Sequence, residues 1–258
     1  MRLRVFAIIL TCFLPLSALA DTAEGIKIRH ANSKNKAKTV RAPEHPVRAG
    51  SKALAFVVAN GQCAGNRNYN DCKGQRERSE ISDEKAIKTE REQWYAFSVM
   101  VPKGTPHIDP SGTILAQFQD SKGSGEITLG FEMWREGLIL VQDDPRTQQS
   151  DDRAPPKPMV IKTVIPNSRL RGRWHDFRVR AVWSAKDSGV IQVWLGDKLV
   201  HQHQGRNLNR NVAPKFKFGL YRTGLDKYRA RVNPTVPTQV IYFDEVRRGP
   251  SAASVAIP

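Results

Sequence analysis

The sequence predicts an all-β protein built as a sandwich of curved antiparallel sheets. Short alternating or continuous apolar runs recur from Ala53 onward, and turn-forming residues separate them. Helical periodicity is nearly absent, apart from one short turn expected within 83–92. We expect strands at Ala53–Val58, Gln93–Val101, Thr113–Gln119, Ile127–Trp134, Leu138–Val141, Trp174–Trp183, Val190–Leu195, Lys215–Tyr221 and Val240–Val246.

Two segments favour a sandwich over an irregular set of strands. The stretch Gly189–His203 reads as two strands joined by a tight turn at Gly196-Asp197. The stretch Trp174–Trp183 has strict alternation, with Arg178 and Arg180 on one face. Its other face carries Phe177, Val179, Ala181 and Trp183. Half of this strand is therefore expected in the core, and the other half is cationic.

The N-terminus has the pattern of a secretory signal peptide over residues 1–20. Arg2 and Arg4 precede a short apolar run, and Ala18-Leu19-Ala20 forms a small-x-small cleavage site. Cys12 lies inside this run, in a context unlike that of a lipid-anchored cysteine. We expect a basic extended segment at 21–50, with at most one edge strand, and a single β-domain at 51–258. The mature protein is expected to be periplasmic or secreted, without a transmembrane segment.

The charge balance indicates a polyanionic partner. The formal net charge is +16, and removal of the two leader arginines leaves +14. A strong positive field concentrates polyanions, although basicity for solubility alone is the competing explanation. Outside the cytoplasm the available polyanions are acidic polysaccharides and envelope surfaces rather than nucleic acid. We expect a monomer that binds an acidic polysaccharide and no nucleic acid.

Two cysteines remain after removal of the leader. Cys63 and Cys72 form an even pair in an exported chain, and a polar, turn-rich loop separates them. We expect a disulfide that braces this loop and contributes about 2–3 kcal/mol at most. Zinc is the weaker interpretation, because no further cysteine is present to complete a site.

Three segments place polar residues on one strand face and apolar residues on the other. They are Arg78–Ile81, Ala116–Gln119 and Lys215–Tyr221. Since side chains alternate along a strand, residues two apart share a face. The polar faces carry Arg78, Glu80, Gln117, Gln119, Lys215, Lys217 and Tyr221. Together these residues supply cations, amides and a phenol, which suit an acidic carbohydrate.

This ordered set resembles the motifs of the jelly-roll polysaccharide lyases, which include alginate lyases, glucuronan lyases and heparin lyase I. Alginate lyases of this fold carry R-x-E-L, Q-I/V-H and Y-F-K-A-G-x-Y in this order. The corresponding segments here are Arg78–Ile81, Gln117–Gln119 and Lys215–Tyr221. The segments Trp174–Trp183 and Ile241–Arg247 also resemble the glucuronan and heparin lyase group. The resemblance implies a concanavalin-like β-jelly-roll of two curved antiparallel sheets and cleavage of a uronate polysaccharide by β-elimination.

The resemblance also implies roles for individual residues. Gln117 and Arg78 are expected to neutralise the uronate carboxylate, and Tyr221 is expected to act as acid and also as base. Neighbouring cations such as Lys217 are expected to lower the pKa of Tyr221 or to hold the sugar. Glu80 is expected to orient Arg78.

One departure from the alginate lyase pattern narrows the expected chemistry. Gln119 stands where those enzymes often have a histidine base. With glucuronate or mannuronate, the proton and the leaving oxygen lie on the same face of the sugar, so one tyrosine can serve both. We therefore expect glucuronate- or mannuronate-type linkages. An inactive protein, or a base supplied by another histidine, stays an open alternative.

The remaining expectations concern accessory residues. Arg178, Arg180 and Lys215 join Lys217, Gln119 and Glu80 as expected substrate-binding residues. His201 and His203 form a weak candidate metal pair. Asp143-Asp144 and Asp151-Asp152, within the long loop 143–158, are candidate ligands of a structural calcium, and no cofactor is expected to be required.

Two other function classes compete with a lyase. A non-catalytic glycan-binding module of the same sandwich class would bind acidic chains without shortening them. A glycoside hydrolase would need two carboxylates that flank the bond, and Glu132 and Glu136 are the nearest candidates. The sequence shows no tighter acidic cluster, so the hydrolase ranks last.

Overall fold

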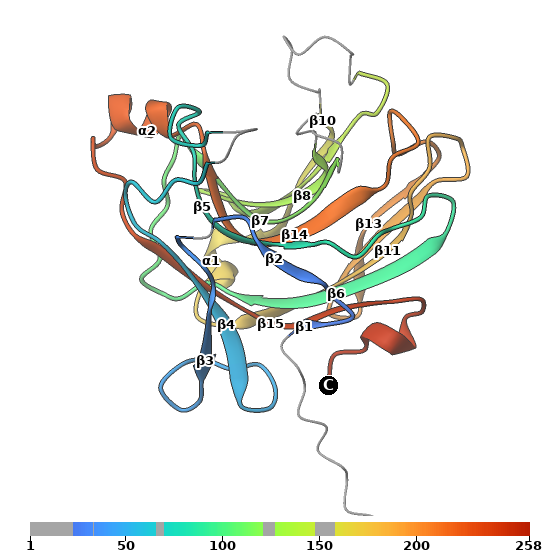
Figure 1. The fold of residues 1–258 in the computed structure, drawn as a ribbon, viewed down its shortest axis with the longest axis horizontal. Coiled ribbons are helices and arrows are strands. Elements are labelled where there is room, and N and C mark those ends of the chain that lie inside the picture. Colours follow the sequence, from blue (N-terminus) through green and yellow to red (C-terminus); the bar gives the residue numbers. More distant parts are fainter. Residues whose placement is uncertain (1–22, 33, 66–69, 121–126, 148–157) are drawn as a thin grey trace, which may run out of the picture.

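Strands dominate the computed structural model, which describes residues 23–32, 34–65, 70–120, 127–147 and 158–258. Two sheets pack face to face, and this arrangement confirms the predicted all-β sandwich (Figure 1). Helices are confined to three short pieces: α1 (Asn167–Leu170), α2 (Leu225–Arg231) and the 3₁₀ turn η1 (Ala253–Val255). The predicted leader at 1–20 lies outside the described residues.

The first sheet, sheet A, contains eight strands. Its order is β13 (Lys198–Gln204), β12 (Val190–Leu195), β11 (Trp174–Val182), β6 (Glu92–Met100), β15 (Gln239–Gly249), β4 (Lys52–Val58) and β3 (Lys38–Arg41). The short strand β1 (Ala23–Glu24) pairs with β15 in the parallel sense. The other pairings within this sheet are antiparallel.

The second sheet, sheet B, contains seven antiparallel strands. Its order is β10 (Pro158–Pro166), β9 (Gly137–Asp143), β8 (Ile127–Trp134), β7 (Gly112–Asp120), β14 (Pro214–Thr223), β5 (Glu77–Asp83) and β2 (Ile28–His30). Sheet B is strongly curved, and its face turned away from sheet A is the concave one (Figure 1). Helix α2 stands at one rim of this concave face, and β10 lies toward the other.

Aromatic side chains from both sheets fill the space between them. Phe97 contacts Phe177 within sheet A and Phe131 and Phe216 across the sandwich, with ring centroids 5.2–6.0 Å apart. Phe118 packs against Tyr95 and Trp183 of the opposite sheet. Edge-to-face and offset pairs of this kind stabilise a core beyond the area they bury. The apolar faces predicted for β7, β11 and β14 are therefore core faces.

The predicted strands are present, with ends shifted by up to three residues. The described residues 83–92 contain no helix, and the short turn expected there is limited to residues 89–90. The segment 21–50 contributes three strands, β1, β2 and β3, rather than one, and these pair with both sheets. Strand β10 was missed because it is an exposed edge strand bounded by prolines.

Strand β5 is the most unusual element. All seven of its residues are buried, although Ile81 is the only apolar one. Burial of polar groups is costly unless each finds a partner. A strand of this composition therefore requires a dense set of polar contacts, and these contacts build the site described next.

Candidate active site

The three polar segments meet on the concave face of sheet B. Strand β14 lies between β7 and β5, and it pairs Tyr221 with Arg78 and Lys217 with Gln117. The sequence-predicted residues of these strands are therefore neighbours. We call Arg78, Glu80, Gln117, Lys217 and Tyr221 the polar cluster.

Glu80 lies at the centre of the polar cluster. Its Oε1 accepts a 2.5 Å hydrogen bond from Nε2 of Gln117, and its Oε2 accepts one from Nη1 of Arg78 at 3.1 Å. Glu80 is 2% exposed and Gln117 is fully buried. The carboxylate thus holds both the amide and the guanidinium, whereas the sequence analysis assigned it to Arg78 alone.

Gly219 of β14 lies beside the site in a backbone conformation that only glycine adopts readily. The side chains of Glu80 and Gln117 meet across β14, and Gly219 lies in register with Glu80 at a bulge of the β14 and β7 pairing. Its φ of +138° belongs to a region that side-chain-bearing residues rarely adopt. A Cβ at this position would lie 2.4 Å from the backbone oxygen of Ser79 and 2.8 Å from Phe56. The site therefore requires glycine here.

Arg78 is held by a second carboxylate that the sequence analysis missed. Asp71 accepts hydrogen bonds from Nε and Nη2 of Arg78 at 2.7 and 2.8 Å, which is the bidentate geometry that makes such pairs strong. Burial acts to lower the pKa of Arg78, but the charges of Glu80 and Tyr221 and the bonds to Asp71 raise it above its ordinary value. Arg78 is therefore a permanent cation within the cluster.

The disulfide loop positions Asp71. Cys63 and Cys72 are bonded, as predicted, and Asp71 directly precedes Cys72. The backbone N–H of Asp71 donates to the carbonyl of Ala64 at 2.8 Å, and its carboxylate is buried. The available signal in the sequence was an aspartate next to a bridged cysteine and seven residues before Arg78.

Tyr221 faces Arg78 directly. The guanidinium carbon lies 3.9 Å from the centroid of the phenol ring, and Tyr221 is 6% exposed. Burial raises the pKa of Tyr221, and the charge of Arg78 counteracts only part of this effect. The expectation of a lowered pKa was wrong, because loss of hydration outweighs the neighbouring cation. The cation at the ring is also Arg78 rather than Lys217.

Lys217 and Lys215 share the concave face with the rest of the cluster. Nζ of Lys217 donates a short hydrogen bond to Oε1 of Gln119. Burial lowers the pKa of Lys217, and the charge of Glu80 opposes this shift. Nζ of Lys215 forms a 2.6 Å ion pair with Glu84 at the end of β5. Gln119 and Lys215 are thus adjacent to the cluster, as the sequence predicted.

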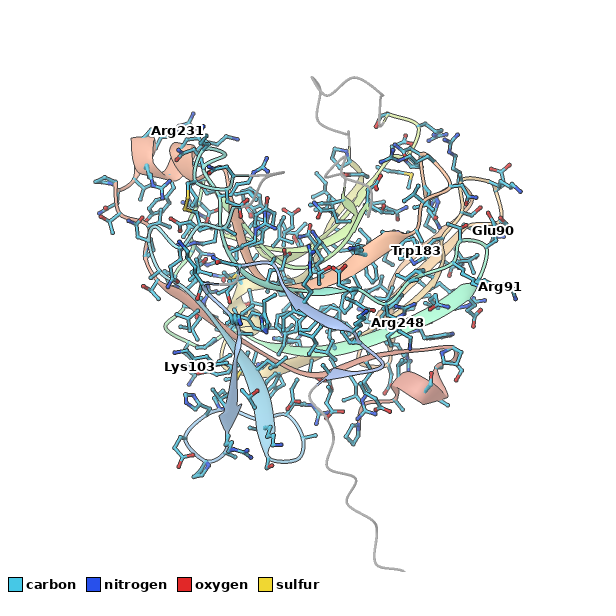
Figure 2. All side chains as sticks on the ribbon, in the orientation of Figure 1. Glu90, Arg91, Lys103, Trp183, Arg231 and Arg248 are labelled. Carbon is cyan, nitrogen blue, oxygen red and sulfur yellow. A yellow bond between two sulfur atoms is a disulfide. The ribbon has the colours of Figure 1, made fainter. Side chains whose placement is uncertain are left out.

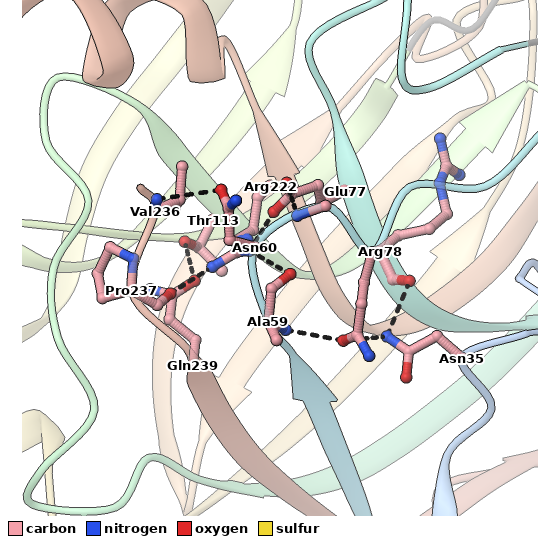
Figure 3. A network of polar contacts seen from close by, with 12 residues as sticks. Asn35, Ala59, Asn60, Glu77, Arg78, Thr113, Arg222, Val236, Pro237 and Gln239 are labelled. Carbon is pink, nitrogen blue, oxygen red and sulfur yellow. Dashed lines mark hydrogen bonds and ion pairs between the residues drawn. The ribbon is translucent and has the colours of Figure 1, made fainter. Parts of the chain in front are cut away.

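A buried ion pair fixes the strands next to Arg78 and Tyr221. Their chain neighbours Glu77 and Arg222 also pair in register, and Arg222 is fully buried. Glu77 accepts a short hydrogen bond from Arg222 and one from the backbone of Gly61 at 2.7 Å. Arg222 also donates to the carbonyls of Pro237 and Ala59 (Figure 3). The bond network ties β5 and β14 to the chain that leaves β4.

The structure does not bring Arg178 and Arg180 to the polar cluster. Both lie on β11 of sheet A, on the face opposite to the core. Arg178 covers the ring of Trp194, 5.3 Å from its centroid, and Arg180 forms a 2.7 Å ion pair with Glu92. The alternation predicted for this strand is correct, but it cannot show which sheet the cationic face belongs to.

Glu132 and Glu136, the candidate carboxylates of a hydrolase, lie in different environments. Glu132 accepts a 2.8 Å hydrogen bond from Nε1 of Trp134, and burial raises its pKa. Glu136 lies exposed in the turn between β8 and β9. Hydrolysis needs two carboxylates on either side of one bond.

Candidate metal ligands are engaged in other contacts. His201 bonds Gln142 at 2.6 Å and His203 bonds the carbonyl of Arg206 at 3.1 Å. Asp144 pairs with Arg146, and Asp151-Asp152 lie outside the described residues. Among the described residues, no group of three or more His, Cys, Asp or Glu is arranged to hold a metal ion. No described helix is long and apolar enough to cross a membrane.

Comparisons with known proteins agree with this geometry. A family model for polysaccharide lyases matches residues 21–247. The fold is similar to that of an endo-β-1,4-glucuronan lyase from the fungus Trichoderma reesei, with a TM-score of 0.66 and 18% identity over 91% of this chain and 95% of that one.

Two alginate lyase structures are also similar. Alginate lyase AlgAT5 of polysaccharide lyase family 7 has a TM-score of 0.56 and 11% identity, over 88% of this chain and 95% of that one. Alginate lyase vAL-1 from a Chlorella virus has a TM-score of 0.53 and 13% identity, over 88% and 92%. At these identities the structures establish a shared fold. No curated protein sequence matches.

Proposed function

Because the chain belongs to the polysaccharide lyase family, we propose that the polar cluster on β5, β7 and β14 is its catalytic centre. Lyases of acidic polysaccharides remove the proton beside a uronate carboxyl group and then expel the glycosidic oxygen. The observation that carries this assignment is the buried assembly of Arg78, Glu80 and Gln117 beside Tyr221. This assembly brings the charged side chains of Arg78 and Glu80, the amide of Gln117 and the phenol of Tyr221 together on the concave face.

The first requirement is to neutralise the uronate carboxylate as negative charge develops. We assign the positive charge to Lys217, and we propose that the second amide N–H of Gln117, whose first is bonded to Glu80, donates to the carboxylate. Preorganised donors of this kind supply much of the rate enhancement, because they need no reorganisation during the reaction. Three of the N–H groups of Arg78 bind Asp71 and Glu80, so its main proposed role is at Tyr221.

The second requirement is proton transfer, which we assign to Tyr221. Its raised pKa keeps the phenol protonated at neutral pH, so it is a competent acid toward the leaving oxygen. As a base it must ionise first, and Arg78 at 3.9 Å stabilises the phenolate. The polar cluster contains no histidine that could serve as the base. Gln119, two residues after Gln117 on β7, stands at the position where alginate lyases often carry one.

A single phenol suits linkages in which the proton and the leaving oxygen lie on one face of the sugar. We therefore propose glucuronate-type linkages first and mannuronate-type linkages second. The similarity to a glucuronan lyase supports this order. We further propose that the protein is exported, since residues 1–20 have the pattern of a leader and Cys63 and Cys72 are bonded.

Unsaturated-uronate absorbance tests the proposed function. Purified protein is mixed with glucuronan, with mannuronate-rich alginate and with guluronate-rich alginate. We expect product from the first, and loss of at least about 100-fold in kcat for Tyr221→Phe, since general acid and base catalysis contributes roughly 10²–10⁴-fold. Tyr242→Phe, a phenol on the outer face of sheet A, is the matched control and retains activity.

Two outcomes would contradict the assignment. An absence of product from every uronate polymer would reject the lyase, and salt-sensitive binding without cleavage would instead favour a glycan-binding module. Full activity of Tyr221→Phe would reject this catalytic centre while leaving the family assignment intact.

A further inference from the structure

A pocket of about 530 Å³ lies beside the first residues of β14, and the proposed catalytic centre does not include it. It is formed between the segment 83–89, which connects β5 to β6, and the segment 211–215, which enters β14. Its volume falls within the range of small-molecule sites, roughly 300–1,000 Å³. Lys215 lines the pocket and stands two residues before Lys217, so the pocket adjoins the polar cluster.

The walls of the pocket are held in place from behind by Arg248. This buried guanidinium donates to the carboxylate of Asp83 at 2.8 Å. It also donates to the backbone carbonyls of Lys85 and Ala86 at 2.8 and 2.9 Å. The segment is therefore fixed by several charge-assisted hydrogen bonds, and the pocket is preformed.

The charges of the pocket favour an anion. Both carboxylates in its wall are paired already, Asp83 with Arg248 and Glu84 with Lys215 and Arg29. Lys85 and Lys88 are exposed, and no carboxylate pairs with either of them among the described residues. Nζ of Lys85 donates only a long, exposed hydrogen bond of 3.4 Å to the carbonyl of Gly25, so both cations still lack a carboxylate partner among the described residues.

The remaining wall suits a sugar ring. Ile87, Val212 and Pro214 present apolar surface, against which the C–H groups of a pyranose can pack. Asn211 and Thr89 add an amide and a hydroxyl that can bond sugar hydroxyl groups. An apolar wall with a few polar groups and two cations that lack a carboxylate partner among the described residues matches a uronate unit.

We propose that this pocket is a distal subsite that binds a uronate unit of the polysaccharide away from the cleaved bond. Tyr221 lies six residues from Lys215 along β14, a span of at most about 20 Å at roughly 3.3 Å per residue. Several sugar units are needed to cross this distance. The subsite therefore contributes only to chains that are long enough to reach it. This inference rests on the proposed function for its substrate class.

The test compares chain lengths in a charge-reversal variant, Lys85→Glu/Lys88→Glu. Size-defined glucuronan tetramers and octamers are the substrates. We expect KM for the octamer to rise about 5- to 20-fold, with kcat unchanged and KM for the tetramer within about twofold, because two attractive contacts become repulsive. The matched control is Lys38→Glu/Lys103→Glu, which changes net charge equally at exposed sites. Figure 2 shows Lys103 at the side of the molecule opposite Glu90 and Arg91, which follow the pocket segment.

Direct binding separates failure of the subsite from failure of the proposed function. Calorimetric titration of the octamer is carried out in the Tyr221→Phe background, with and without the two charge reversals. Weaker octamer binding with unchanged tetramer binding supports the subsite, whether or not the wild-type protein cleaves glucuronan. Equal effects on both lengths, no effect on either, or the same effect in the control variant would overturn it. An inactive wild type with intact length-dependent binding would reject the lyase chemistry alone.

Discussion

Replacing Asp71 by asparagine is expected to weaken both the fold and the catalytic centre. The Asp71 and Arg78 side chains are 2% and 9% exposed, and two hydrogen bonds of 2.7 and 2.8 Å join them. Removing one charge from a buried pair typically costs about 3–5 kcal/mol, because the other charge stays buried. Glu80 still partners Arg78, so the lower end, ~3 kcal/mol, is expected here. Domains of this kind are stable by about 5–15 kcal/mol, so the variant should fold.

The chain offers a matched control for this substitution. Asp144 and Arg146 form the same two-pronged contact, at 3.0 and 3.1 Å, but the arginine is 72% exposed. Asp144→Asn is therefore expected to cost under about 1 kcal/mol. Comparison of the two variants isolates the effect of burial on the free energy of unfolding, because both pairs have two hydrogen bonds and both substitutions replace aspartate by asparagine.

Urea denaturation followed by tryptophan fluorescence measures both variants. With a slope of roughly 2–3 kcal/mol per molar urea, Asp71→Asn should lower the midpoint by about 1–1.5 M and Asp144→Asn by less than about 0.5 M. Turnover of the Asp71 variant should fall as well, because its Arg78 is no longer held over Tyr221. Equal midpoint shifts, or full activity of Asp71→Asn, would refute the reasoning.

Four further outcomes are expected. Gly219→Ala should lower the unfolding free energy by roughly 1–3 kcal/mol from its positive φ alone, and more from the overlap with Ser79; an unchanged melting temperature would contradict this. Burial raises the pKa of Tyr95 to about 12. Its contribution to stability is therefore fully present below pH ~10 and is lost as the pH rises toward 12, so Tyr95→Phe should flatten the decline seen in urea titrations at pH 9, 10 and 11. Cys63→Ser/Cys72→Ser should cost about 2–3 kcal/mol and reduce kcat, and wild-type turnover in this variant would show that the loop does not position the site. Dialysis against EDTA should leave lyase activity unchanged, and its loss with restoration by calcium would reveal a required ion.

The sequence predicted the fold well because apolar and polar residues that alternate along a strand lie on its two opposite faces. The alternation in β11 and β14 predicted which residues enter the core, and the aromatic contacts of Phe177, Phe216 and Phe218 confirm it. The same alternation identified the polar face of Arg78, Gln117, Lys217 and Tyr221. These are local properties of a strand, so a single sequence contains them.

Alternation did not predict how deeply strand β5 is buried. Strand β5 has one apolar residue among seven, yet it is buried on both faces. Its stability depends on partners outside the strand. Asp71 comes from the preceding disulfide loop, and Gln117, Arg222 and Arg248 come from distant segments. Side-chain alternation placed Arg78 and Glu80 on one strand face, but it cannot reveal burial that ion pairs make possible.

The sequence by itself determined the central strands of both sheets, their apolar faces and the residues that form the polar cluster. Tertiary structure decided which sheet carries each cationic face, and it separated Arg178 and Arg180 from the site. It also decided the electrostatics. Packing of segments far apart in the chain buries Tyr221 and raises its pKa, and the fold of the disulfide loop brings the Asp71 carboxylate to Arg78. The physical reason is that strand parity is local, whereas hydration and ion pairing depend on every segment that folds against a side chain.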